Sequence, residues 1–348
     1  MYIDMILQMC HNCKIMTALG VGLELGEQYR EQLDEQYGFG TAAMLNGALH
    51  SADLPHCEES DQTLSYLHLI PDQPQHDRPV LYVPGFSEGT IAKVPLAVEL
   101  AERGMDVLFL DQNRSGILRS GGKRDATYSQ AINNLAVLEQ EGLVDGPVDV
   151  IAHSHGALVL QEMVRIARQR EQTTFNGSNV VMLAPAGSNA DENLVKLGVR
   201  FGHNLVSEAR TDKDFPDPDG EMLKAGAKTL TANISRTVLE VWELARRRVD
   251  YRDLASVVAN LMVLSYAEDR LFPDRVHAST MHDTMVATNQ DTKDVLANFS
   301  WATPISWQEQ DDGTFRMGKD ASHNDEQFNP ARVANSVKQL FRLAADQA

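Results

Sequence analysis

The sequence is poor in cysteine and in positive charge, and it lacks a long uninterrupted apolar segment. Only 3 of its 348 residues are cysteines, too few for the disulfide framework that is typical of small exported domains. The formal net charge of -18 at pH 7 argues against broad electrostatic attraction to nucleic acid or to an anionic membrane. Because of this charge, we expect no nucleic-acid partner. No segment has the ~18 consecutive apolar residues that span a bilayer, so we also expect no stable membrane insertion.

The first residues also lack the features of a secretion signal. Residues 1–16 are fairly apolar, but Asp4 comes early and no basic leader precedes the apolar residues. We therefore expect a cytoplasmic location. Cys10 and Cys13 have the C-x-x-C spacing, yet a zinc site needs a second ligand pair, and the spacing of Cys57 and its histidine neighbours does not provide one. We expect no metal site.

The composition is that of a soluble globular chain, with 43% hydrophobic and 23% charged residues. A chain of 348 residues is long for one compact domain and short for two, which favours a core with an inserted lobe. We predict an N-terminal extension over residues 1–62, partly helical or disordered. The core then covers residues 63–187 and 260–348, and a helical cap is inserted over residues 188–259.

From residue 63 onward, short apolar runs alternate with segments of helical periodicity. The predicted strands cover residues 63–70, 79–83, 105–110, 147–152, 180–183 and 261–266, with another near Ile305. The predicted helices cover residues 93–103, 126–141, 156–170, 276–286 and 330–345. Near-continuous apolar strands that alternate with helices indicate a parallel sheet covered on both faces, so the predicted fold class is α/β.

Two stretches differ from this pattern. Residues 38–60 show no clear strand alternation and are predicted to be loop-like. Between residues 190 and 259 apolar residues recur at helical spacing, as at Leu194, Leu197 and Phe201. We interpret this second stretch as the cap, whose apolar stripes could line a pocket for an apolar acyl or alcohol group.

The segment from Val148 to Leu158 places a serine at the corner between a predicted strand and a predicted helix. Ala152 and Gly156 lie two residues before and two residues after Ser154. A turn this sharp imposes strained dihedrals on the serine and brings strand and helix close together, so only small residues fit at the flanks. The serine hydroxyl then lies above a helix N-terminus, whose dipole favours developing negative charge.

This corner resembles the nucleophile elbow, G-x-S-x-G, of the α/β-hydrolase family, with Ala152 in place of the first glycine. Four other segments resemble motifs of the same family, and they occur in the family's order along the chain. They are the oxyanion loop at residues 82–89, the D-x-R-G-x-G turn at 111–116, the turn of the triad acid at 267–273, and the histidine loop at 319–326.

The resemblance implies a mostly parallel central sheet with helices on both faces and an inserted helical cap. It also implies a serine hydrolase with Ser154 as the nucleophile, Asp269 as the acid and His323 as the base. The backbone N–H groups of Phe86 and His155 would form the oxyanion hole. Such a mechanism needs no metal and no organic cofactor.

Other residues compete for the roles of acid and base. Glu268 is adjacent to Asp269, although the turn motif favours Asp269. His277 and His282 fall in a predicted helix, whereas His323 lies in the loop before the last helix, where the family has its histidine.

The residues at the corner also have alternative interpretations. Ser154 could be an ordinary helix N-cap, a position that serine favours. His153 and His155 flank it, but adjacent side chains on a tight turn point apart, so we expect neither to be the base. We expect His155 to line the mouth of the pocket.

The predicted function is hydrolysis of a carboxylic ester of modest size with an apolar acyl or alcohol group. Thioesterases, amidases and C–C bond hydrolases use the same triad, so the fold alone does not choose among them. A lipase that acts at a lipid surface, or a non-catalytic binding protein with this fold, is a further alternative.

Overall fold

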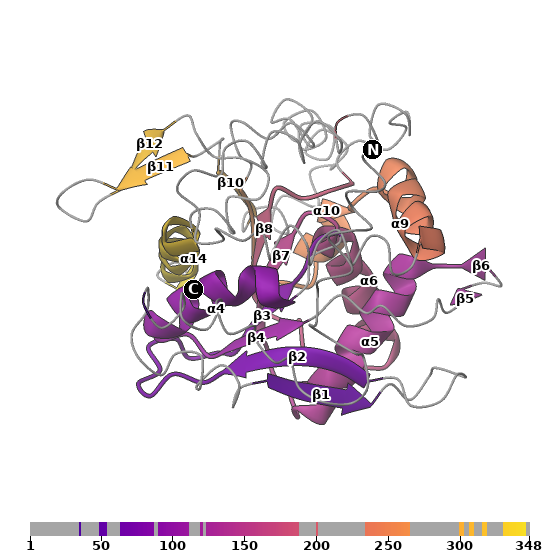
Figure 1. Ribbon diagram of the computed structural model, residues 1–348, viewed down its shortest axis with the longest axis horizontal. Coiled ribbons are helices and arrows are strands. Elements are labelled where there is room, and N and C mark those ends of the chain that lie inside the picture. Colours follow the sequence, from indigo (N-terminus) through magenta and orange to yellow (C-terminus); the bar gives the residue numbers. More distant parts are fainter. Residues whose placement is uncertain are drawn as a thin grey trace.

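The computed structural model describes residues 35, 49–53, 63–86, 90–110, 119–120, 123–187, 200, 234–264, 299–302, 306–309, 315–318 and 330–345. Within these residues a central sheet has helices on both faces (Figure 1). This arrangement confirms the predicted α/β class.

The strand order of the large sheet is β1-β2-β4-β3-β7-β8-β9-β10. Its strands are β1 (Leu49–Asp53), β2 (Thr63–Leu69), β3 (Val80–Val83), β4 (Val107–Leu110), β7 (Asp149–His153), β8 (Asn179–Leu183), β9 (Asn260–Leu264) and β10 (Phe299–Ala302). The pairs β1–β2 and β2–β4 are antiparallel, and the pairs from β4 to β10 are parallel. The carboxyl ends of β3, β7, β8, β9 and β10 therefore lie along one edge of the sheet, where ligands bind in open α/β sheets.

Helices cover the sheet from both sides (Figure 1). They are α4 (Thr90–Glu102), α5 (Ala126–Gln140), α6 (Gly156–Gln169), α9 (Ile234–Arg246), α10 (Tyr251–Ala255) and α14 (Pro330–Ala345). The helices α4 and α14 pack together on one face, and α5 packs against α6 and α9 on the other. Two short hairpins complete the described elements: β5 (Arg119–Ser120) with β6 (Lys123–Arg124), and β11 (Ser306–Glu309) with β12 (Phe315–Gly318).

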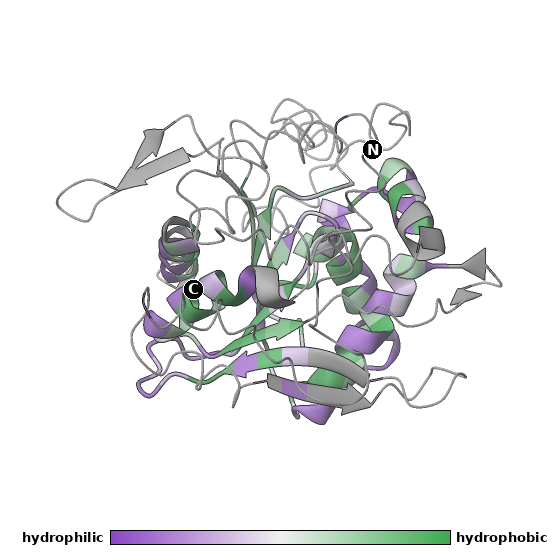
Figure 2. Cartoon of the chain, in the orientation of Figure 1, coloured by the Kyte–Doolittle hydropathy of each residue, from purple (hydrophilic) through white to green (hydrophobic). Residues whose placement is uncertain are grey.

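The alternation of side chains along each strand divides the core into two layers. In β3, Leu81 and Val83 join the layer under α5 and α6, whereas Val80 and Tyr82 join the layer under α4 and α14. The ring of Tyr82 stacks on that of Phe109 with centroids 4.5 Å apart. The central strands are coloured as hydrophobic in Figure 2, and their apolar residues are divided between the two core layers because helices bury each face of the sheet.

The predicted elements over residues 63–187 agree closely with those of the structure, and the predicted last helix coincides with α14. The loop-like prediction before residue 60 is wrong at residues 49–53, which form β1 at the edge of the sheet. The strand predicted near Ile305 is replaced by two: β10 ends at Ala302 and β11 begins at Ser306, and Ile305 itself lies outside the described residues.

The range predicted as a cap is described only in its later part. Residues 188–199 and 201–233, with the helical stripe of Leu194 and Phe201, lie outside the described residues. The helices α9 and α10 fall within the range, and Leu244, Tyr251 and Leu254 pack into the same core layer as α5 and α6.

Candidate active site

Ser154 lies at the corner between β7 and α6 and has a left-handed backbone. Its φ is +49°, a conformation that costs an L-residue about 1–2 kcal/mol. Two hydrogen bonds hold the corner in place. The N–H of Ser154 donates to the carbonyl oxygen of Leu183, and its carbonyl oxygen accepts from the N–H of Ala186, each at 2.9 Å. Such strain persists only where the surroundings enforce it, and it is concentrated at functional sites.

The small residues that flank Ser154 allow the corner to close. A Cβ atom on Gly156 would lie 2.3 Å from the carbonyl oxygen of Val83, so a larger residue does not fit there without movement of the backbone. Ala152 is fully buried in β7 and pairs with Val83 of the neighbouring strand. The methyl group of Ala152, where the family motif has glycine, is therefore accommodated inside the core.

Ser154 is not the N-cap of α6. The capping position belongs to His155, whose side chain makes no capping hydrogen bond. Since α6 begins at Gly156, Ser154 lies two residues before the first residue of the helix. The partial positive charge at that terminus favours negative charge that develops beside Ser154.

The two residues predicted to supply the oxyanion hole lie at the same edge of the sheet. Val83 of β3 pairs with Ala152 of β7 in parallel register. Phe86 follows Val83 by three residues, and His155 follows Ala152 by three residues. The side chain of Phe86 is half-buried and packs against the core layer under α5 and α6. The register thus brings both backbone segments to the corner.

The side chains of His153 and His155 are buried, with exposed fractions of 0% and 1%. His155 was expected at the mouth of a pocket, and that expectation is wrong for its side chain. Its Nε2 instead lies 3.1 Å from Oγ1 of Thr127, in the first turn of α5. The hydroxyl of Thr127 also contacts Oε2 of Glu243 at 2.5 Å.

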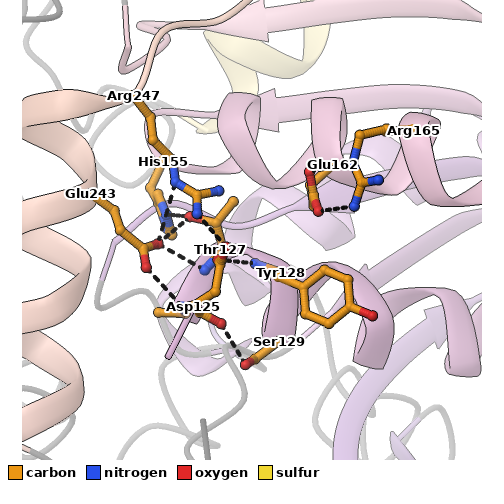
Figure 3. Close-up of polar contacts among 10 residues, drawn as sticks. Asp125, Thr127, Tyr128, Ser129, His155, Glu162, Arg165, Glu243 and Arg247 are labelled. Atoms are coloured by element: carbon orange, nitrogen blue, oxygen red, sulfur yellow. Dashed lines mark hydrogen bonds and ion pairs between the residues drawn. The ribbon is translucent and has the colours of Figure 1, made fainter. Parts of the chain in front are cut away.

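Glu243 comes from α9, and its carboxylate lies at the N-terminus of α5 (Figure 3). Its Oε1 accepts from the N–H of Ala126 and its Oε2 from the N–H of Thr127, both at 2.9 Å. Arg247 places its Nε 4.0 Å from Oε2 of Glu243 and also pairs with Asp125. This network could not be predicted from the sequence, because no local motif links Thr127 to a glutamate 116 residues further along the chain.

The predicted acid and base lie outside the described residues, and so do their competitors. Asp269 follows the end of β9, and His323 falls between β12 and α14. The same holds for Glu268, His277 and His282. The turn predicted at residues 111–116 lies outside as well.

The other end of β7 carries a buried carboxylate, Asp149, which anchors the strand. Its oxygens accept hydrogen bonds from His76 Nε2 at 2.8 Å and from the backbone N–H of Asn179 at 2.7 Å. Arg78 contacts it at 3.3 Å. Burial alone would raise the pKa of Asp149, but these hydrogen bonds outweigh burial, and its pKa is lowered. Asp149 remains charged and holds β7 in register from the end opposite Ser154.

The described residues hold no group of three or more His, Cys, Asp or Glu side chains arranged to bind a metal ion. Among the described helices, none combines the length and the apolar character needed to cross a bilayer.

Comparison with known proteins agrees with this geometry. Residues 80–335 match the model of the alpha/beta hydrolase family, and the chain belongs to that family. No curated protein sequence matches it.

Solved structures share the fold at low sequence identity. An esterase from Thermogutta terrifontis superposes with a TM-score of 0.52 at 14% identity, over 85% of this chain and 98% of its own. The N-formylmaleamic acid deformylase Nfo of Pseudomonas putida S16 gives 0.53 at 12% identity, over 83% and 99%. A bromoperoxidase from Bacillus anthracis gives 0.52 at 12% identity, over 84% and 99%. Proteins with this fold catalyse several different reactions, so the fold does not identify the substrate of this chain, which has to be inferred from the site.

Proposed function

We propose that this member of the α/β-hydrolase family is a serine hydrolase that cleaves carboxylic esters through an acyl-enzyme. The observation that carries the proposal is the left-handed Ser154 at the corner of β7 and α6. A hydroxyl group on such a corner projects from the carboxyl edge of the sheet toward a bound substrate.

In the proposed reaction, the Oγ of Ser154 attacks the ester carbonyl carbon while His323 takes its proton. Asp269 holds the imidazole in the required tautomer and stabilises the imidazolium. The oxyanion that forms accepts hydrogen bonds from the N–H groups of Phe86 and His155, each worth on the order of 3 kcal/mol. The alcohol leaves with the proton from His323. Water, deprotonated by the same residue, then releases the acid and restores Ser154.

The proposed substrate is an uncharged ester of modest size. The chain carries a net charge of -18, which disfavours a highly anionic substrate. The apolar residues of the proposed cap, residues 188–259, favour an apolar acyl or alcohol group. The choice of an ester rests on these features, since the fold is shared with a deformylase and a bromoperoxidase.

Hydrolysis of a p-nitrophenyl ester series from acetate to dodecanoate tests the proposal, with the matched variant Ser154→Ala as control. We expect turnover that is highest for short to medium acyl groups and absent in the variant. Turnover of thioesters or amides, with none of any ester, would reassign the substrate class. A sharp rise in rate at an emulsion interface would instead identify a lipase, and no turnover of any of these substrates would favour a binding protein.

A further inference from the structure

We propose that Glu243, on α9, is a positioning residue that orients His155 through the hydroxyl group of Thr127. This inference rests on the proposed function, in which the backbone N–H of His155 is a donor of the oxyanion hole. The three side chains come from α9, α5 and the corner before α6, and they point toward one another in Figure 3. Their exposed fractions are 1% or less, so water does not compete with these contacts.

The direction of the hydrogen bonds follows from counting hydrogens. Both oxygens of Glu243 accept backbone N–H groups at the start of α5, and Arg247 lies beside them. A carboxylate oxygen accepts hydrogen bonds and does not donate them. The 2.5 Å contact with Thr127 is therefore a short O–H···O bond in which the threonine hydroxyl donates.

The hydroxyl group of Thr127 has a single hydrogen, which it donates in the hydrogen bond to Glu243. Toward the ring of His155, 3.1 Å away, Thr127 can therefore only accept. The Nε2 of His155 must carry a hydrogen, and Nδ1 is the acceptor nitrogen of the neutral ring. Glu243 thus selects one tautomer of a residue that it does not touch.

The position of the ring affects the site because His155 directly follows the strained Ser154. A ring held at Nε2 limits rotation of the His155 backbone, whose N–H is the proposed oxyanion donor. Oxyanion stabilisation depends on donors preset within tenths of an ångström. A helix within the predicted cap range is thereby connected to the corner of the nucleophile.

The variants Thr127→Val and Thr127→Ser separate the link from the surrounding fold. Valine keeps the shape of threonine and removes the hydroxyl, whereas serine restores it. Thr174→Val is the matched control, since Thr174 is equally buried and donates at 3.0 Å to the carbonyl oxygen of Val144. Thr174 precedes the amino end of β8, whereas Ser154 follows the carboxyl end of β7.

For the best p-nitrophenyl ester, we expect Thr127→Val to lower kcat about 10-fold with little change in KM. Thr127→Ser should recover most of this loss, and Thr174→Val should stay within twofold of the wild type. Spectra of 15N-histidine-labelled protein, assigned with His155→Asn, should show neutral His155 as the Nε2–H form in the wild type and a mixture in Thr127→Val.

Glu243→Leu provides a second test that leaves Thr127 in place. Leucine accepts no hydrogen bond, so the hydroxyl group of Thr127 can turn its hydrogen to the ring, and the Nδ1–H form of His155 should appear. An unchanged tautomer and an unchanged kcat in Thr127→Val and Glu243→Leu would overturn the positioning role of Glu243 and leave the proposed function standing. A wild-type protein without turnover would overturn the proposed function and the positioning role with it.

Discussion

The carbonyl oxygen of Val83 lies 2.3 Å from the point that a Cβ atom on Gly156 would occupy. No real Cβ tolerates such a distance to a backbone oxygen. The end of β3 is therefore packed directly against the first residue of α6, and this contact closes the corner that strains Ser154.

Gly156→Ala should lower the free energy of unfolding by about 2–3 kcal/mol, because either backbone must move to admit the methyl group. It should also slow turnover, since the same movement displaces Ser154. Gly146→Ala is the matched control: nothing lies within 4 Å of its added Cβ, so its effect should stay below about 0.5 kcal/mol. Urea denaturation measures both. Equal stability of the two variants would contradict the packing described here.

Ser154→Gly should be more stable than Ser154→Ala by about 1 kcal/mol, although both should lack hydrolytic activity. Glycine adopts the left-handed φ of +49° without strain, whereas alanine at this position keeps the strain of the serine. Thermal unfolding of the two variants gives the comparison. If alanine proves equally stable or more stable, the corner is not strained in solution.

Asp149→Asn should cost about 3 kcal/mol at pH 7, because it leaves His76 and Arg78 without their buried anionic partner. The pKa of Asp149 is lowered on folding, so its stabilisation is complete above the unfolded pKa of about 3.9 and is lost as pH falls through the folded value. The wild type should therefore lose stability in acid more steeply than the variant. Asp145→Asn, at an exposed position, should match the wild type at every pH.

His68→Gln should remove a stabilising term that depends on pH in the opposite sense. The hydrogen bond to Asp106 raises the pKa of His68 against the effect of burial, and the charge of Glu141 adds to it. The stabilisation is complete below the unfolded pKa of about 6.5 and is lost as pH rises through the higher folded pKa. The free energies of unfolding of the wild type and of His68→Gln should differ at pH 6 and become similar at pH 9. A constant difference between them would show that His68 does not titrate between pH 6 and pH 9 in this cluster.

The parts of the fold that the sequence predicts are those with a local pattern. The corner at Ser154 is such a case, because an apolar strand, small flanking residues and an amphipathic helix follow one another directly. The strand β1 could not be predicted because, among the described strands, it lies at the sheet edge and pairs with β2 alone, and its residues show no alternation of apolar and polar side chains.

The contact between Glu243 and Thr127 could not have been predicted for a different reason. It joins residues 116 positions apart, and each looks ordinary in its own helix, a glutamate in α9 and a threonine in the first turn of α5. Only the packing of α9 on α5 turns them into a buried pair.

The proposed mechanism depends most on whether His323 activates Ser154, and the rate of labelling by an alkyl fluorophosphonate measures this activation. We expect a single label on Ser154 in the wild type and a labelling rate at least about 100-fold lower in His323→Ala. His277→Ala and His282→Ala, the matched controls, should react like the wild type. Rapid labelling of His323→Ala, or slow labelling of either control variant, would show that His323 is not the base.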